Sequence, residues 1–143
     1  MLDFNAHPFL AHFPISFIFL LFLSGLMAWK SGEQFWLRSF QYLLILSGIA
    51  LAFSAMSGYH ARDLLLVANR DDDILLNHRD LMMWASSLLW ALMLLYPVLK
   101  ISKSKKFPVY LVFWVCLVLL LLIWGAKQGG DMVYVRGFGT GQG

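Results

Sequence analysis

The strongest constraint on the fold of this chain is a set of four apolar runs, each about as long as a membrane is thick. The runs cover residues 8–29, 37–59, 81–99 and 107–126. A helix needs about 20 mainly apolar residues to cross the hydrocarbon core of a bilayer, and only helices or closed barrels satisfy their backbone hydrogen bonds there. Of the 143 residues, 60% are hydrophobic and 13% are charged, unlike a soluble domain. The sequence therefore predicts an integral membrane protein with four transmembrane helices.

The links between these runs predict how the helices pack. Residues 30–36 and 100–106 form short links, and residues 60–80 form a longer polar link. Because short links place consecutive helices side by side and antiparallel, we expect an all-α, up-down-up-down four-helix bundle. The length suits a single membrane domain over residues 1–143. No internal repeat is evident in the sequence.

The tail, residues 127–143, contains several glycines. Gly129 and Gly130 are expected to end the fourth helix, since glycine often follows the last helical residue. The alternation of side chains over residues 131–136 predicts a short extended segment folded over the end of the bundle.

The basic residues predict the orientation of the chain in the membrane. The two short links and their edges hold Lys30, Arg38, Lys100, Lys103, Lys105 and Lys106. Cytoplasmic loops carry an excess of Lys and Arg, so both termini are expected on the outer, periplasmic side of a bacterial inner membrane. The same rule explains the net charge of +3 without a nucleic-acid partner.

The sequence offers few groups for covalent catalysis. Its one cysteine, Cys116, lies inside an apolar run, which excludes a disulfide framework and a thiolate metal cluster. Neither a nucleophile beside a base nor a phosphate-binding loop is evident. Binding or electron transfer is favoured over stand-alone catalysis, and whether the protein is an enzyme stays open.

All four histidines are predicted to lie at one end of the bundle. His7 and His12 open the first helix, His60 closes the second and His78 opens the third. Antiparallel packing brings these helix ends together at the outer face. Ionisable groups at membrane depth are costly and tend to mark function, and imidazole binds iron, copper and zinc. Each histidine alone has a structural explanation as a helix-end residue, so the convergence is the stronger signal.

Two kinds of site fit this cluster. Haem b requires two axial imidazoles from facing helices, for which His12 and His78 are the expected pair. It also requires a flat apolar slot, which the small residues of the second run could provide, although these residues equally predict close helix packing. A transition metal ion such as copper or zinc would instead gather three or four of the histidines. The candidate partners of the haem propionates are the arginines Arg62, Arg79 and Arg136.

Motifs near both ends of the chain stand out by their residue order. They are HPFLAHFPI over residues 7–15, Ser57-Gly58, His78, and GGDMVY over residues 129–134 followed by Gly137 and Gly139. In combination they resemble the DUF2231 family of small bacterial membrane proteins over essentially the whole chain. The resemblance implies functional positions at His7, His12 and His78, but no defined activity, because the function of the family is undefined. Relatives joined to Rieske or c-type cytochrome modules imply electron-transfer surroundings.

Two functions from different classes follow. The leading hypothesis is a haem b or metal-binding protein of the lipid bilayer that serves electron transfer with a periplasmic redox protein, with His7 or His60 assisting the axial pair. The alternative is a non-enzymatic assembly or anchoring subunit whose outer face docks a periplasmic partner. A visible spectrum separates the two, because a reduced haem b gives sharp bands. The sequence leaves the formation of a homo-oligomer open.

Overall fold

The computed structural model describes residues 7–67, 73–99 and 107–137, and over these residues the chain is almost entirely helical. The four helices are α1 (His7–Ser31), α2 (Gln34–Val67), α3 (Asp73–Leu99) and α4 (Val109–Tyr134), with no strand among the described residues. Each helix is long and apolar enough to cross a membrane. The predicted all-α membrane bundle is confirmed.

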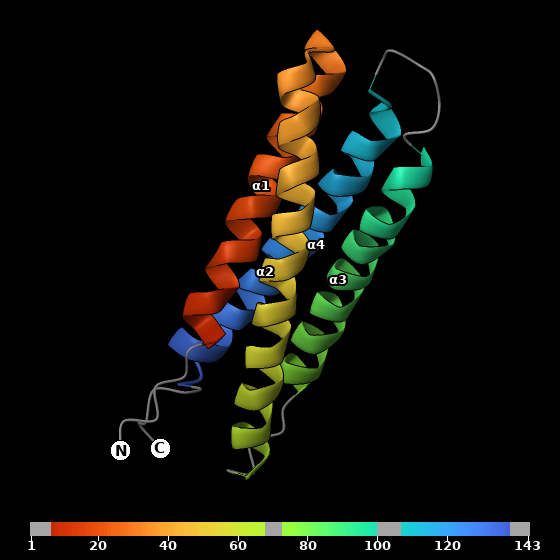
Figure 1. Ribbon diagram of the computed structural model, residues 1–143. Coiled ribbons are helices and arrows are strands. Elements are labelled where there is room, and N and C mark those ends of the chain that lie inside the picture. The colour runs from red at the N-terminus through yellow and green to blue at the C-terminus, as the bar shows by residue number, and fades with distance from the viewer. Residues whose placement is uncertain (1–6, 68–72, 100–106, 138–143) are drawn as a thin grey trace.

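The helices alternate in direction, so α1 and α3 begin at the end of the bundle where α2 and α4 finish (Figure 1). We call this the terminal end. Helix α1 packs against α2 and α4, and α3 packs against α4 and, less extensively, against α2. The pairs α1–α3 and α2–α4 make no close backbone contact over the described residues, because they occupy opposite corners.

The outer surface of the bundle is apolar as well as its interior. Phe113 on α4 is 70% exposed and Leu94 on α3 is 73% exposed, although both are large hydrophobic residues. Water would not favour such a surface. These side chains therefore contact the lipid bilayer, as expected for membrane-spanning helices.

The prediction that glycines end the fourth helix is wrong, because α4 continues through Gly129 and Gly130 to Tyr134. The extended segment expected from residue 131 is helical as far as Tyr134. The amide of Val135 then donates to the carbonyl of Asp131 at 3.0 Å, and that of Arg136 does so at 3.2 Å. Glycine costs a helix only about 1 kcal/mol relative to alanine, which side-chain packing on the bare backbone can offset. Residues 138–143 of the tail lie outside the described residues.

The polar link between the second and third helices is also shorter than the sequence indicated. Helix α2 runs on to Val67, and α3 already begins at Asp73, so most of the polar stretch over residues 60–80 is helical. No proline or glycine interrupts that stretch, and polar residues are tolerated in a helix beyond the hydrocarbon core. At the opposite end, Gly32 takes a left-handed φ of 68° and its amide donates to the Ala28 carbonyl at 3.0 Å, which ends α1.

At Gly48 the small residues of α2 serve helix packing and leave no slot. A Cβ added to Gly48 would lie 3.0 Å from the Met93 sulfur of α3, so a methionine side chain already fills that space. In α1, a Cβ on Gly25 would lie 3.1 Å from the fully buried ring of Phe40. Bulky side chains on one helix thus seat on the glycines of another.

The two hairpins, α1–α2 and α3–α4, place their buried residues in the same pattern. Over residues 34–63 of α2, for which burial is described, each buried position has a buried counterpart in α4 at an offset of 71 residues. The α2 positions are Phe40, Leu44, Ser47, Gly48, Leu51, Ser54 and Ala61, and their counterparts are Leu111, Val115, Val118, Leu119, Leu122, Gly125 and Met132. In the first helices the same offset relates Pro14, Ile18, Leu21 and Gly25 to Ala85, Leu89, Leu92 and Tyr96.

The bundle is therefore two versions of one helical hairpin, related by an approximate two-fold axis that runs along the bundle. The sequence does not display this repeat, because few of the paired residues are identical. What the two hairpins share is the position of buried side chains along the helix.

Candidate functional site: a histidine pair at the terminal end

The structure brings two of the four histidines together. The rings of His7, the first residue of α1, and of His78, in the second turn of α3, approach each other across the bundle. Their ring centroids lie 6.4 Å apart and their planes cross at 77°. Because the α1 and α3 backbones make no close contact, the two imidazoles span the interior at the terminal end.

Each imidazole seats on a glycine in the second helix of its own hairpin. A Cβ added to Gly58 of α2 would lie 3.0 Å from Cε1 of His7, and one added to Gly129 of α4 would lie 3.3 Å from Cε1 of His78. The offset of 71 residues that relates the hairpins also relates His7 to His78 and Gly58 to Gly129. The pair is thus arranged about the approximate two-fold axis.

Hydrogen bonds fix the orientation of both rings. Nδ1 of His78 donates to the Gly125 carbonyl at 2.8 Å. Nδ1 of His7 lies 2.9 Å from the Ser57 hydroxyl, which itself donates to the Ser54 carbonyl at 2.8 Å. Since that hydroxyl hydrogen is already used, Nδ1–H of His7 is the donor. In a neutral imidazole this tautomer places the lone pair on Nε2, as it does in metal-binding histidines whose other ring nitrogen donates a hydrogen bond to the protein.

The other two histidines do not join the pair. His12 is exposed, and its Nδ1 donates to the Pro8 carbonyl at 2.6 Å. His60 is exposed on α2. A separation of five residues turns His12 about 140° around the helix from His7, so the two cannot face the interior together. The buried residue Ile18 lies eleven residues from His7, close to three turns, and this periodicity could have identified His7 from the sequence.

The predicted arginines differ in their surroundings. Arg79 is committed to its neighbour Asp80, with Nη2 at 2.7 Å and Nε at 2.9 Å from one carboxylate oxygen. Arg136 is exposed beyond the end of α4. Nε of Arg62 is buried, and within the described part of the chain it has no hydrogen-bond partner.

A second buried polar atom lies on α4, in the residue before the glycine that contacts His78. Gln128 precedes Gly129 on α4, and its Oε1 is buried without a hydrogen-bond partner among the described residues. Gln128 is the counterpart of Ser57 at the same offset, but its side chain makes no bond to His78 like that of Ser57 to His7. The surroundings of the pair are thus symmetric in shape and asymmetric in polar groups.

Groups that could hold a metal ion through several ligands are not found in the described residues. No three His, Cys, Asp or Glu side chains among them come together. The described residues therefore bring two imidazoles together without a third potential metal ligand from these residue types. This arrangement suits a group that supplies its other ligands itself.

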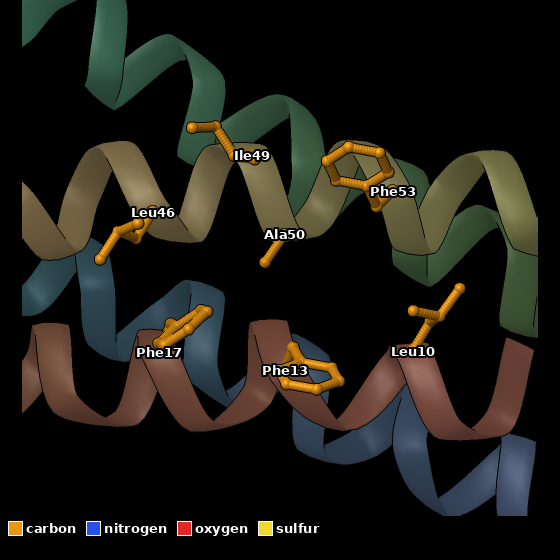
Figure 2. Close-up of a pocket in the computed structure, with 7 residues that line it drawn as sticks. All are labelled: Leu10, Phe13, Phe17, Leu46, Ile49, Ala50 and Phe53. Atoms are coloured by element: carbon orange, nitrogen blue, oxygen red, sulfur yellow. The ribbon is translucent and has the colours of Figure 1, made fainter.

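The bundle also has an apolar groove of about 220 Å³ on its outer side, between α1 and α2 (Figure 2). Aliphatic and aromatic side chains line it without a polar group: Leu10, Phe13, Phe17, Leu46, Ile49, Ala50 and Phe53. None of the histidines lines the groove. The groove is a feature of the lipid-facing surface, separate from the histidine pair.

The fold and the paired histidines define a small four-helix membrane protein with an inward-facing polar site at one end. A family model described as "Predicted membrane protein (DUF2231)" matches residues 3–142, and the chain belongs to that family. No curated protein and no solved structure matches the chain.

Proposed function

We propose that this protein binds one haem b between its two hairpins, with His7 and His78 as axial ligands, and serves electron transfer in the membrane. The ligand pair differs from the one that the sequence indicated, because His12 faces away from the bundle interior. The observation that carries the proposal is the position of the two anchored imidazoles on opposite sides of the bundle axis.

The separation of the rings supports axial ligation. Two imidazoles that bind one metal ion from opposite sides, at the usual nitrogen–metal distance of about 2.0–2.1 Å, have centroids about 6.3 Å apart. The centroids of His7 and His78 are 6.4 Å apart. Their Nδ1 atoms are both held by hydrogen bonds that favour a lone pair on Nε2.

The number of ligands favours haem over a bare ion. Structural zinc takes four protein ligands and catalytic zinc takes three, whereas haem needs only its axial ligands from the protein. The described residues bring two imidazoles to this place and no third ligand from His, Cys, Asp or Glu. The buried, unpartnered Nε of Arg62 adds a requirement for negative charge that a cation alone does not meet.

The chain's own residues would set the properties of the site. Ser57 and the Gly125 carbonyl orient the two rings and increase their basicity, while Gly58 and Gly129 let the rings lie close to the α2 and α4 backbones. The haem would supply one-electron redox chemistry. Because two histidines would hold the haem, the site would suit electron transfer more than binding of oxygen.

The test is the visible spectrum of the detergent-purified protein expressed with ample haem. We expect sharp reduced bands of a low-spin haem in the wild type. His7→Ala and His78→Ala should each abolish that spectrum, while His12→Ala and His60→Ala should retain it. Each variant must elute as a monodisperse peak. The proposal would be overturned if the wild type takes up no haem, or if His7→Ala and His78→Ala both leave the spectrum unchanged. Metal analysis of the same samples tests copper and zinc.

The second candidate is a docking or assembly subunit, and one observation favours it. Tyr134 and Val135 at the end of α4 are 89% and 78% exposed, so large apolar groups stand out at the terminal end. Such residues often mark interaction surfaces. A protein without haem that forms cross-links from Tyr134 to a neighbouring protein would support this function instead.

We also propose that the terminal end faces the periplasm of a bacterial cell, with the redox partner on that side. The density of Lys and Arg in the two links at the opposite end supports this orientation. A cysteine at Tyr134, in a Cys116→Ala background, should react with an impermeant reagent in intact cells. A cysteine at Ser31 should react only after lysis, and the reverse pattern would invert the orientation.

A further inference from the structure

We infer that Arg62 is the binding residue for the carboxylate edge of the bound group, at the seam between α2 and α3. This inference rests on the proposed haem function and adds the orientation of the ligand. It predicts that each hairpin contributes one histidine to the bound group. Only the contact between α2 and α3 binds the carboxylates of that group.

The position of Arg62 on α2 follows from the helical repeat. Gly48, Ala55 and Arg62 follow one another at intervals of seven residues and therefore share one stripe of the helix. Gly48 packs against Met93 of α3, which shows that this stripe faces α3. Arg62 is also one turn beyond Gly58, the seat of His7, and so lies at the level of the terminal end.

The seam that Arg62 faces is the least extensive helix contact in the bundle. Helices α2 and α3 pack over a shorter stretch than α1 and α4, which form the equivalent seam on the other side of the two-fold axis. The axis relates Arg62 to Val133 of α4. One seam therefore carries a cation, and the equivalent position on the other carries an apolar side chain.

The charge of Arg62 calls for an anionic partner. Its Nε is buried, and the described residues offer it neither a hydrogen bond nor an ion pair. A buried guanidinium donor without a partner is costly, whereas Arg79, on the next helix, already pairs with Asp80. Planar guanidinium matches a carboxylate in geometry, with two parallel hydrogen bonds. Haem b carries both of its carboxylates on one edge, which matches a site with a cation on one side only.

The experiment compares haem b with haem dimethyl ester, which keeps the iron and the ring but lacks the carboxylate charges. Apoprotein in detergent is titrated with each, and binding is followed by the Soret band. We expect the wild type to bind haem b about tenfold or more tightly than the ester, in line with a charge-assisted hydrogen bond. Arg62→Gln should bind the two alike, and Arg62→Lys should keep part of the preference.

Arg79→Gln is the matched control, because it removes an arginine that already has a partner. It should bind haem b and its ester as the wild type does. If Arg62→Gln keeps the full preference for haem b, the inference is wrong while the haem function stands. If the wild type binds neither compound, the haem function itself fails. Should Arg62→Gln not purify as a monodisperse species, the Arg62→Lys variant and the wild-type preference decide the outcome.

Discussion

The hairpin of α1 and α2 and the hairpin of α3 and α4 share one plan, but the first adds a side-chain hydroxyl to the groups that hold its histidine. In both, a histidine near the start of the first helix lies on a glycine of the second. In both hairpins a backbone carbonyl accepts from the ring, that of Ser54 in the first and that of Gly125 in the second, and in the first a side-chain hydroxyl also bonds the ring. The shared features are those that shape the interior, and the differences lie in the polar side chains around the two histidines.

The two hairpins also differ in how closely their helices pack. Helices α1 and α2 contact each other over a longer stretch than α3 and α4 do. In the second hairpin the indole of Trp114 donates to the Leu88 carbonyl at 3.0 Å. The residue at the equivalent position of the first hairpin is Leu43, whose side chain has no hydrogen-bond donor. Two hairpins can therefore share a pattern of buried positions while different interactions pack their helices together.

The largest effect is expected at a position where the two hairpins carry side chains of very different size. Gly25 of α1 corresponds to Tyr96 of α3, and Gly25→Leu would force its side chain against the buried ring of Phe40. Overpacking of a filled core costs about 1–3 kcal/mol, so the thermal unfolding midpoint in detergent should fall clearly.

The matched control is Gly130→Leu, since a Cβ at Gly130 meets nothing within 4 Å. It should leave the midpoint unchanged or raise it slightly, because leucine is a better helix former than glycine. Equal midpoints for the two variants would show that the contact of Gly25 with Phe40 is not tight in solution.

A smaller effect is expected at the two glycines that seat the histidines. A Cβ would lie 3.0 Å from the ring at Gly58 and 3.3 Å at Gly129, so Gly58→Ala should lower the unfolding midpoint more than Gly129→Ala. The cost at Gly58 should be on the order of 1 kcal/mol. Combining Gly58→Ala with His7→Ala should remove that cost, since the ring that the methyl group meets is gone. An additive double variant would argue against the contact.

The smallest expected effect concerns the one hydroxyl that distinguishes the surroundings of the two histidines. Under the proposed function, Ser57→Ala removes one of the two acceptors beside His7 Nδ1–H and leaves the Ser54 carbonyl, which weakens electron donation to the iron and raises the reduction potential. A rise of about 30 mV corresponds to roughly a threefold change in the equilibrium constant, at about 59 mV per tenfold for one electron. Redox titration of the haem measures it.

Ser54→Ala is the control for this measurement, because it removes a hydroxyl but keeps the carbonyl to which Ser57 donates. Ser57→Thr should restore the wild-type potential by restoring a hydroxyl. A potential that stays the same in Ser57→Ala would mean that the two ligands are held equivalently and that the asymmetry between the hairpins has no electronic effect.

Much of the site could be located from the sequence, but its composition could not. Chain direction alone predicts that His7 and His78 lie at one end, since both open helices that start there. The choice between His7 and His12 depends on which side of α1 faces the bundle interior. The helical spacing of buried residues such as Ile18 indicates that side. The chemistry of the residue types favoured neither histidine.

The continuation of α4 could not be read from its glycines. Taken by itself, a pair of adjacent glycines favours the end of a helix. In the folded chain, Gly125 and Gly129 lie under side chains of α3, and the packing stabilises a helix that the local sequence would end. In a similar contact, Met93 of α3 packs on Gly48 of α2 and fills the apolar slot predicted there.

The sequence by itself determined the class of protein, because the length and hydropathy of a run decide whether it can cross a bilayer, independently of its neighbours. It also determined that the termini share one side, because that follows from the number of crossings. Only the tertiary structure decided which histidines meet, that Arg62 faces a seam without a partner among the described residues, and that two hairpins repeat one pattern. These features depend on the rotation of each helix about its axis, which is fixed when side chains of one helix seat on the glycines of another.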